Sequence, residues 1–210
     1  AAGLYGEEMH WSGLSYTEHV LAVLEVLISF EPDADAVIAC LLQHALTAKI
    51  ATLDEIREKF GTDVRSIVSG VHLLAHVTLR NKRMTLENLR LMFLRVSDDV
   101  RVVLIVLCKQ RAILEHLELL PEDERKRQCR DVLQLFAPVA ARLGIYTLKH
   151  QLEGKAFPVA YPTDAERIHQ QMGDIHRVNG RFLDETAKTL RSFLRSEGVS
   201  AEVEVREKQP

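Results

Sequence analysis

The spacing of apolar residues is the feature that most restricts how this chain can fold. Between residues 16 and 30, apolar side chains recur at three- and four-residue steps, at Val20, Val23, Leu24, Leu27 and Ile28. This period matches one face of an α-helix and not a strand, in which alternate residues face the same side. Because similar spacing continues along most of the chain, the sequence predicts an all-α fold, built as a helical bundle.

Start and stop signals divide this pattern into separate helices. Asp33 is expected to begin one helix, with Val37, Ile38, Leu41 and Leu42 on its buried face. Residues 52–55 form a capping box that opens a short helix, and Gly61 ends it. Pro138 lies within an otherwise helical stretch and predicts a kink or break there. Further helices are expected over residues 62–79, 86–97, 100–119, 121–143 and 161–196, with a polar loop at 79–83.

The last fifty residues differ in character from the rest. Residues 161–196 carry many charges, which predicts a long, exposed linker helix. Residues 199–206 alternate apolar and polar side chains, the period of a strand, and a lone strand needs a partner from elsewhere. The predicted organisation is a helical domain over 1–160, a linker helix over 161–198, and a strand over 199–210 that belongs to a following domain.

Composition and charge exclude several classes of protein. The formal net charge of −3 argues against a general nucleic-acid surface, and no apolar run reaches the roughly 18 residues of a membrane span. Three cysteines, Cys40, Cys108 and Cys129, show no paired spacing, which argues against a disulfide framework or a zinc site. We therefore expect a cytoplasmic protein with no membrane partner. The sequence lacks an initiator Met and a signal peptide, so a trimmed fragment is expected.

Several blocks of the sequence occur in a recognisable order. Residues 12–19 are similar to the motif S-G-E-P-Y-x-x-H, residues 99–105 read D-V-R-V-V-L-I, and residues 136–145 are similar to [YF]-A-P-L-A-x-R-L-G-I. Together these blocks resemble the RelA/SpoT family of (p)ppGpp synthetases and hydrolases. The resemblance implies an HD-type helical bundle for residues 1–160, followed by a synthetase domain whose first strand is residues 199–210.

The resemblance also implies where active members hold their metal, usually manganese. They use a His, an adjacent His-Asp pair and a distant Asp, and the metal acidifies a water. Alignment without gaps retains the first ligand as His19, places Gln43 and His44 at the pair, and places Lys109 at the distant aspartate. Two further pairs are changed, since the catalytic Glu-Asp pair becomes Thr47-Ala48 and the guanine-contacting Arg-Lys pair becomes His10-Trp11.

These replacements predict a hydrolase site that has lost its chemistry. The Lys109 ammonium would repel a divalent cation, and no carboxylate remains at the aligned positions. We therefore expect no catalytic residue and no metal cofactor, with manganese only if the site is rearranged around His19 and His44. The simpler interpretation of those two is a pair of hydrogen-bonded core histidines. Lys109 is expected to fill the vacated cation position, while His10, Trp11 and Lys109 remain candidate nucleotide contacts.

The function that the resemblance implies is regulatory. The longer protein would transfer pyrophosphate from ATP to GTP or GDP in the stringent response and would associate with the ribosome. In this chain we expect an inactive pseudo-hydrolase that biases the synthetase domain of the same protein, its expected partner. Two alternatives stay open: a residual metal-dependent (p)ppGpp pyrophosphohydrolase, and an allosteric module that binds a guanine nucleotide.

Overall fold

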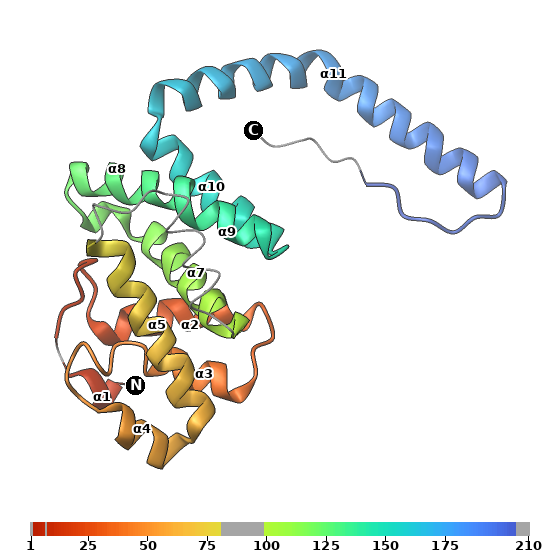
Figure 1. Ribbon diagram of the computed structural model, residues 1–210. Helices are drawn as coiled ribbons and strands as arrows, with labels where there is room; N and C mark the ends of the chain where they lie inside the picture. The colour runs from red at the N-terminus through yellow and green to blue at the C-terminus, as the bar shows by residue number, and fades with distance from the viewer. Residues whose placement is uncertain (1, 7, 81–98, 205–210) are drawn as a thin grey trace. The chain divides into compact units, whose positions relative to one another are not determined.

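The computed structural model describes residues 2–6, 8–80 and 99–204, and within these ranges it contains helices and no sheet (Figure 1). The all-α prediction is therefore confirmed. The chain separates into two compact units, Ala1–Ala160 and Tyr161–Pro210, and each is described by itself. The helix expected over residues 86–97 lies outside the described residues.

Helix α7 (Val100–Glu115) is the centre of the first unit. It contacts α2, α3 and α5 and also α10, so it joins the N-terminal and C-terminal helices around one core (Figure 1). From Val102 to Leu114, every residue except Leu104 and Arg111 is buried. The other α-helices that the structure describes in this unit are α1 (Ala2–Tyr5), α2 (Tyr16–Ile28), α3 (Ala34–Leu41), α4 (Leu53–Phe60), α5 (Thr62–Arg80), α8 (Glu122–Asp131), α9 (Ala137–Arg142) and α10 (Tyr146–Ala160).

The predicted helix boundaries rest on the expected local hydrogen bonds. The Asp33 carboxylate accepts a bond of 2.8 Å from the Ala36 N–H and thereby begins α3. Thr52 and Glu55 form the predicted capping box of α4, with both reciprocal bonds present. Gly61 ends α4 at φ +93°, a backbone conformation that glycine adopts without strain.

Helix α3 ends at Leu41, one residue before Leu42, which was expected on its buried face. His44 therefore lies in the series of turns that follows the helix. The Tyr5 hydroxyl donates to the Leu41 carbonyl at 2.7 Å and accepts the His44 N–H at 3.4 Å, so it provides partners for backbone groups at the point where the helix stops. The predicted buried face was also wrong in part. The buried side chains of α3 are Ala36, Ala39 and Cys40, while Val37, Ile38 and Leu41 are half-buried.

The irregularity predicted near Pro138 is present as a π-helical turn, and the chain does not break there. Residues Val132–Phe136 form a π-helical turn between α8 and α9, and Pro138 lies in the first turn of α9. Proline lacks an N–H and its ring collides with the carbonyl four residues earlier, so a regular α-helix cannot continue through it. The wider turn before the proline relieves that collision while the backbone remains helical.

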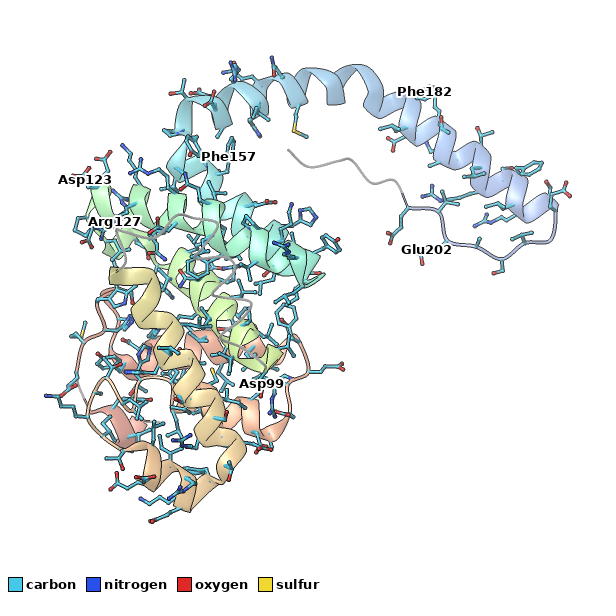
Figure 2. All side chains as sticks on the ribbon, in the orientation of Figure 1. Asp99, Asp123, Arg127, Phe157, Phe182 and Glu202 are labelled. Atoms are coloured by element: carbon cyan, nitrogen blue, oxygen red, sulfur yellow. The ribbon has the colours of Figure 1, made fainter. Side chains whose placement is uncertain are left out.

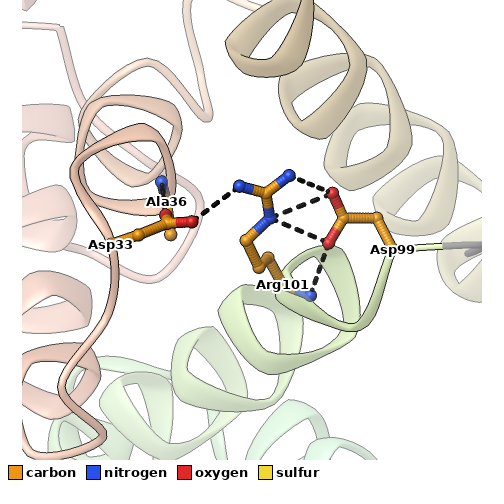
Figure 3. A network of polar contacts seen from close by, with 4 residues as sticks. All are labelled: Asp33, Ala36, Asp99 and Arg101. Atoms are coloured by element: carbon orange, nitrogen blue, oxygen red, sulfur yellow. Dashed lines mark hydrogen bonds and ion pairs between the residues drawn. The ribbon is translucent and has the colours of Figure 1, made fainter.

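Arg101 joins the beginnings of two helices (Figure 3). Its guanidinium donates to the Asp99 carboxylate at 2.7 Å, and to the Asp33 carboxylate, also at 2.7 Å. Each carboxylate also caps its own helix, because Asp99 accepts the Arg101 N–H at 2.9 Å and Asp33 accepts the N–H of Ala36. The bonds from Arg101 lower the pKa of Asp99, so this carboxylate stays charged. The network fixes the start of the central helix against α3.

Replacing Arg101 with Met is expected to lower the free energy of unfolding by about 1 kcal/mol, because partly exposed charged hydrogen bonds contribute modestly. Urea unfolding followed by circular dichroism measures the change. Lys126→Met is the matched control, because Lys126 pairs with Glu122 on the exposed surface of α8, and it should cost nothing measurable. An equal loss of unfolding free energy in the two variants would show that the bonds of Arg101 to Asp33 and Asp99 do not stabilise the fold.

The second unit consists of α11 (Pro162–Ser196) and the residues that follow it. The Arg191 guanidinium donates to the Val203 carbonyl at 2.7 Å, which holds part of the tail along the helix. Phe182 is 67% exposed on α11 (Figure 2). Residues 199–204 form no strand, and the described residues contain no other strand that could pair with them. The strand therefore stays a prediction, and residues 205–210 lie outside the described residues.

No helix in the described ranges combines the length and the apolarity that crossing a membrane requires.

Candidate functional site: a buried histidine cluster

Three histidines from separate segments meet inside the first unit. His10 comes from the turn before α2, His19 from the first turns of α2, and His44 from the turns after α3. They are 4%, 0% and 4% exposed, respectively. One ring nitrogen from each lies within 4.8 Å of those from the other two. The fold therefore places three potential metal ligands in one buried position.

The rings of the three histidines are packed closely. His10 and His19 stack nearly parallel, with ring centroids 4.0 Å apart and an angle of 11° between the planes. His44 lies across them, at 4.8 Å from His10 and 5.2 Å from His19. The Tyr16 ring is 5.0 Å from His44. Such close packing of imidazoles is favourable when the rings carry no charge.

A tight turn holds His10 in the cluster. The His10 N–H donates to the Leu14 carbonyl at 2.7 Å, and the Gly13 N–H donates back to the His10 carbonyl at 3.0 Å. The turn requires φ +90° at Gly13, which a residue with a side chain rarely adopts. The Ser12 hydroxyl lies 2.7 Å from His10 Nδ1 and fixes the ring. The Ser-Gly pair noted in the sequence therefore has a structural role, because it positions His10.

Several polar atoms of the cluster have no hydrogen-bond partner. Both ring nitrogens of His19, Nε2 of His44 and the side-chain oxygen of Gln43 are buried and unpaired. Each such atom costs about 1–3 kcal/mol, because it has lost its bonds to water. The expected pair of hydrogen-bonded core histidines is therefore wrong for His19. Unpaired atoms of this kind indicate a place where a ligand could supply the missing partner.

Lys109 adds a positive charge beside the three rings. It lies on α7, is 8% exposed, and its burial lowers its pKa to about 8. Burial, followed by the charge of Lys109, lowers the pKa of His10 to about 3 and that of His44 still further. The pKa of His19 is also lowered, by burial first and then by His10 and Lys109. All three imidazoles are therefore neutral near pH 7, the form that binds metals.

The remaining candidate residues from the sequence analysis differ in burial and in their contacts. Trp11 is 43% exposed, although its ring is only 5.2 Å from His10. Gln43 is buried, and its amide contacts the Cys40 sulfur at 3.8 Å. The Thr47 hydroxyl is exposed and lies 3.5 Å from His72 Nδ1, and Ala48 is half-buried next to it. The structure thus brings together His10, His19, His44 and Lys109.

The role of His10 was missed from the sequence. The alignment presented it as a candidate nucleotide contact, and no spacing rule relates residues 10, 19 and 44. The glycine at position 13 indicates a turn that could bring residue 10 back to α2. A single glycine, however, does not determine the direction that the chain takes after a turn.

The cluster does not fit manganese. Within the ranges that the structure describes, its donor set is three neutral nitrogens and no carboxylate. Manganese prefers carboxylate, carbonyl and water oxygens, whereas imidazole suits zinc, copper and nickel. The Lys109 charge nearby also opposes a hard cation that has no carboxylate to neutralise it. No step of a manganese-dependent reaction can therefore be assigned to these residues.

Comparisons with known proteins identify the family. Residues 1–146 match the HD domain family. The chain is 32% identical over 199 residues to a guanosine-3′,5′-bis(diphosphate) 3′-pyrophosphohydrolase of Haemophilus influenzae, which covers 94% of this chain and 29% of the relative. A protein of the same name from Aquifex aeolicus is 29% identical over 205 residues, with 97% and 29% covered. A GTP pyrophosphokinase of Myxococcus xanthus is 27% identical over 207 residues, with 97% and 27% covered.

The chain spans less than a third of the length of these relatives. The match to the HD domain covers well over half of the chain, and the relatives are named for two activities, guanosine-3′,5′-bis(diphosphate) pyrophosphohydrolase and GTP pyrophosphokinase. The order of the sequence blocks, the helical bundle and these matches agree, and the chain belongs to the HD-domain family, in its RelA/SpoT branch.

Proposed function

We propose that this HD domain is a pseudo-hydrolase that does not cleave (p)ppGpp and that regulates a synthetase domain in the same protein. The observation that carries the proposal is the lack of a carboxylate in the described cluster, which consists of three histidines beside the buried Lys109 where active members of the family hold manganese. A metal-activated water needs a bound ion, and a general acid or base needs a suitable carboxylate or imidazole within reach. Thr47 and Ala48 cannot replace the catalytic carboxylate pair.

The relatives support a proposal for the activity of the longer protein that contains this domain. A GTP pyrophosphokinase among them supports a longer protein that transfers pyrophosphate from ATP to GTP or GDP. In this proposal the protein acts in the cytoplasm during the stringent response and associates with the ribosome. The HD domain contributes by making different contacts in the open and closed states of the synthetase, which is the requirement for coupling between two sites.

The test of inactivity is direct. The 210-residue chain is incubated with ppGpp and either Mn²⁺ or Zn²⁺, and pyrophosphate release is measured, with the Haemophilus influenzae pyrophosphohydrolase as the positive control. We expect no release above the reaction without protein. Release that disappears in a His19→Ala variant would instead support a residual hydrolase.

The regulatory part needs the full-length protein. Its rate of pyrophosphate transfer is compared with that of a version lacking residues 1–160, and we expect the rates to differ by at least about fivefold, the lower end of usual coupling between sites. Equal rates would contradict regulation by this domain. Calorimetry of the 210-residue chain with GDP, GTP and ppGpp tests the remaining alternative, because saturable heat that Lys109→Ala abolishes would indicate a nucleotide receptor.

A further inference from the structure

The histidine cluster has the features of a site built from nitrogen ligands. His10, His19 and His44 converge from three different segments, and all are at least nine-tenths buried. Two of them carry ring nitrogens without any partner, both on His19 and one on His44. A neutral imidazole has a lone pair on one nitrogen, and a metal ion is the ligand that can accept several such lone pairs at once.

We propose that His10, His19 and His44 together bind one Zn²⁺ ion, at a site that differs from the family's manganese site in its ligands and in its metal. The sequence argued against zinc because the cysteines lack the necessary spacing, and against any metal cofactor because Lys109 replaces an aspartate and no carboxylate remains. The fold changes this conclusion because it brings His10 to the other two histidines. The proposal does not depend on whether the domain hydrolyses (p)ppGpp, since binding is measured without any substrate.

The surroundings of His10 are suited to this role. Metal-bound histidines usually donate their second ring N–H to an oxygen, which fixes the tautomer and the orientation of the ring. The Ser12 hydroxyl, 2.7 Å from His10 Nδ1, is in the place to accept that bond and leaves the Nε2 lone pair for the ion. The Ser12 backbone N–H approaches the same nitrogen at 3.3 Å, a longer contact that the metal-bound tautomer would give up.

The distances require only a small adjustment. The ligand nitrogens lie within 4.8 Å of one another, whereas nitrogens bound to a tetrahedral zinc at about 2.1 Å are roughly 3.4 Å apart. Ring rotations that separate the stacked His10 and His19 can close this difference. With three protein nitrogens, a water is expected to complete the four-coordinate geometry.

Lys109 works against the ion and so provides a sensitive test. Its charge acts on all three rings, and a positive charge nearby disfavours a second one. Removing that charge should therefore strengthen zinc binding and should not weaken it. If Lys109 served only in packing, its replacement would not be expected to strengthen zinc binding.

The experiment measures metal binding to the untagged 210-residue chain after removal of metals with EDTA. Competition with a chromogenic chelator gives affinity and stoichiometry for Zn²⁺ and Mn²⁺, and Co²⁺ provides a visible spectrum of tetrahedral nitrogen coordination. We expect one Zn²⁺ per chain, Mn²⁺ binding at least about tenfold weaker, and a loss of at least about tenfold in His10→Gln and in His44→Gln. Lys109→Met should bind Zn²⁺ at least about tenfold more tightly.

The controls are His150→Gln, at an exposed position of α10, and Lys126→Met, whose side chain pairs with Glu122 on α8. Neither residue belongs to the cluster, and both variants should bind as the original chain does. Circular dichroism confirms that each variant is folded. His10→Gln is preferred to a change at the fully buried His19, because the neighbours of His10 in its turn, Met9 and Trp11, are exposed. The proposal is overturned if the chain takes up no Zn²⁺, if His10→Gln and His44→Gln bind it unchanged, or if His150→Gln loses as much affinity as they do.

Discussion

Lowering the pH from 7.5 to 5.5 in the presence of EDTA is expected to reduce the free energy of unfolding by about 4 kcal/mol, about 1.4 kcal/mol for each of three histidines. Burial and the nearby Lys109 lower the pKa of His10, His19 and His44 far below the usual 6.5. The free energy of unfolding of a small domain is only about 5–15 kcal/mol, so this loss is a large part of the total.

The sign follows from which state takes up protons. Below pH 6.5 the histidines of the unfolded chain bind protons, whereas the three buried histidines of the folded chain stay neutral. Acid therefore favours unfolding. The contribution to stability is complete above pH 6.5 and is lost progressively as the pH falls toward the folded pKa, about 3 for His10. A comparison ending at pH 5.5 stays above the range in which most carboxylates take up protons.

Urea unfolding at the two pH values measures this effect, and His10→Gln should reduce the difference by about a third. The control is His150→Gln, which removes an exposed histidine of α10 and should leave the difference unchanged. Equal stability at pH 7.5 and 5.5 would mean that the three imidazoles are not held neutral in the folded chain.

Replacing Gly13 with Ala is expected to lower the free energy of unfolding by about 3 kcal/mol. Two costs combine at this position. The backbone conformation, at φ +90°, disfavours any residue with a side chain by about 1–2 kcal/mol. In addition, a Cβ at residue 13 would lie 2.8 Å from the Cβ of Leu119, an atom fixed to the backbone that cannot rotate away.

Gly6→Ala is the matched control, because Gly6 also has a positive φ, +59°, but nothing lies within 4 Å of the position of its added Cβ. It should cost only the conformational part, about 1 kcal/mol. Combining Gly13→Ala with Leu119→Gly removes the contact, so the double variant should lose less than the sum of the two single variants. Equal losses for Gly13→Ala and Gly6→Ala would exclude the contact with Leu119.

The local part of the fold could be predicted from the sequence. Asp33, Thr52 and Glu55 act on their own backbone within three residues, so their effect does not depend on the rest of the molecule. The helical irregularity before Pro138 is local for the same reason. A second capping box, Ser15 with Glu18, was overlooked at the start of α2, although the same four-residue signal was present.

The parts that depend on distant residues could not be predicted. At the end of α3, the Leu41 carbonyl accepts a bond from the Tyr5 hydroxyl, which comes from a residue 36 positions earlier in the chain. The sequence indicated His19, His44 and Lys109 through the family alignment, but not that His10 would join them. A helical period shows which side of a helix is apolar, and it does not say which loop residue a turn will bring to that side.

The π-helical turn at Val132–Phe136 has a consequence for comparing this chain with its relatives. Such a turn contains about one residue more than an α-helical turn, so the side chains of α9 are rotated by roughly 100° from where an uninterrupted helix would put them. We expect a relative with one residue fewer in this stretch to present the same side chains to the core through an ordinary α-helix. A single gap there in an alignment would therefore preserve the core, whereas forcing the two chains to align without a gap would pair buried residues with exposed ones.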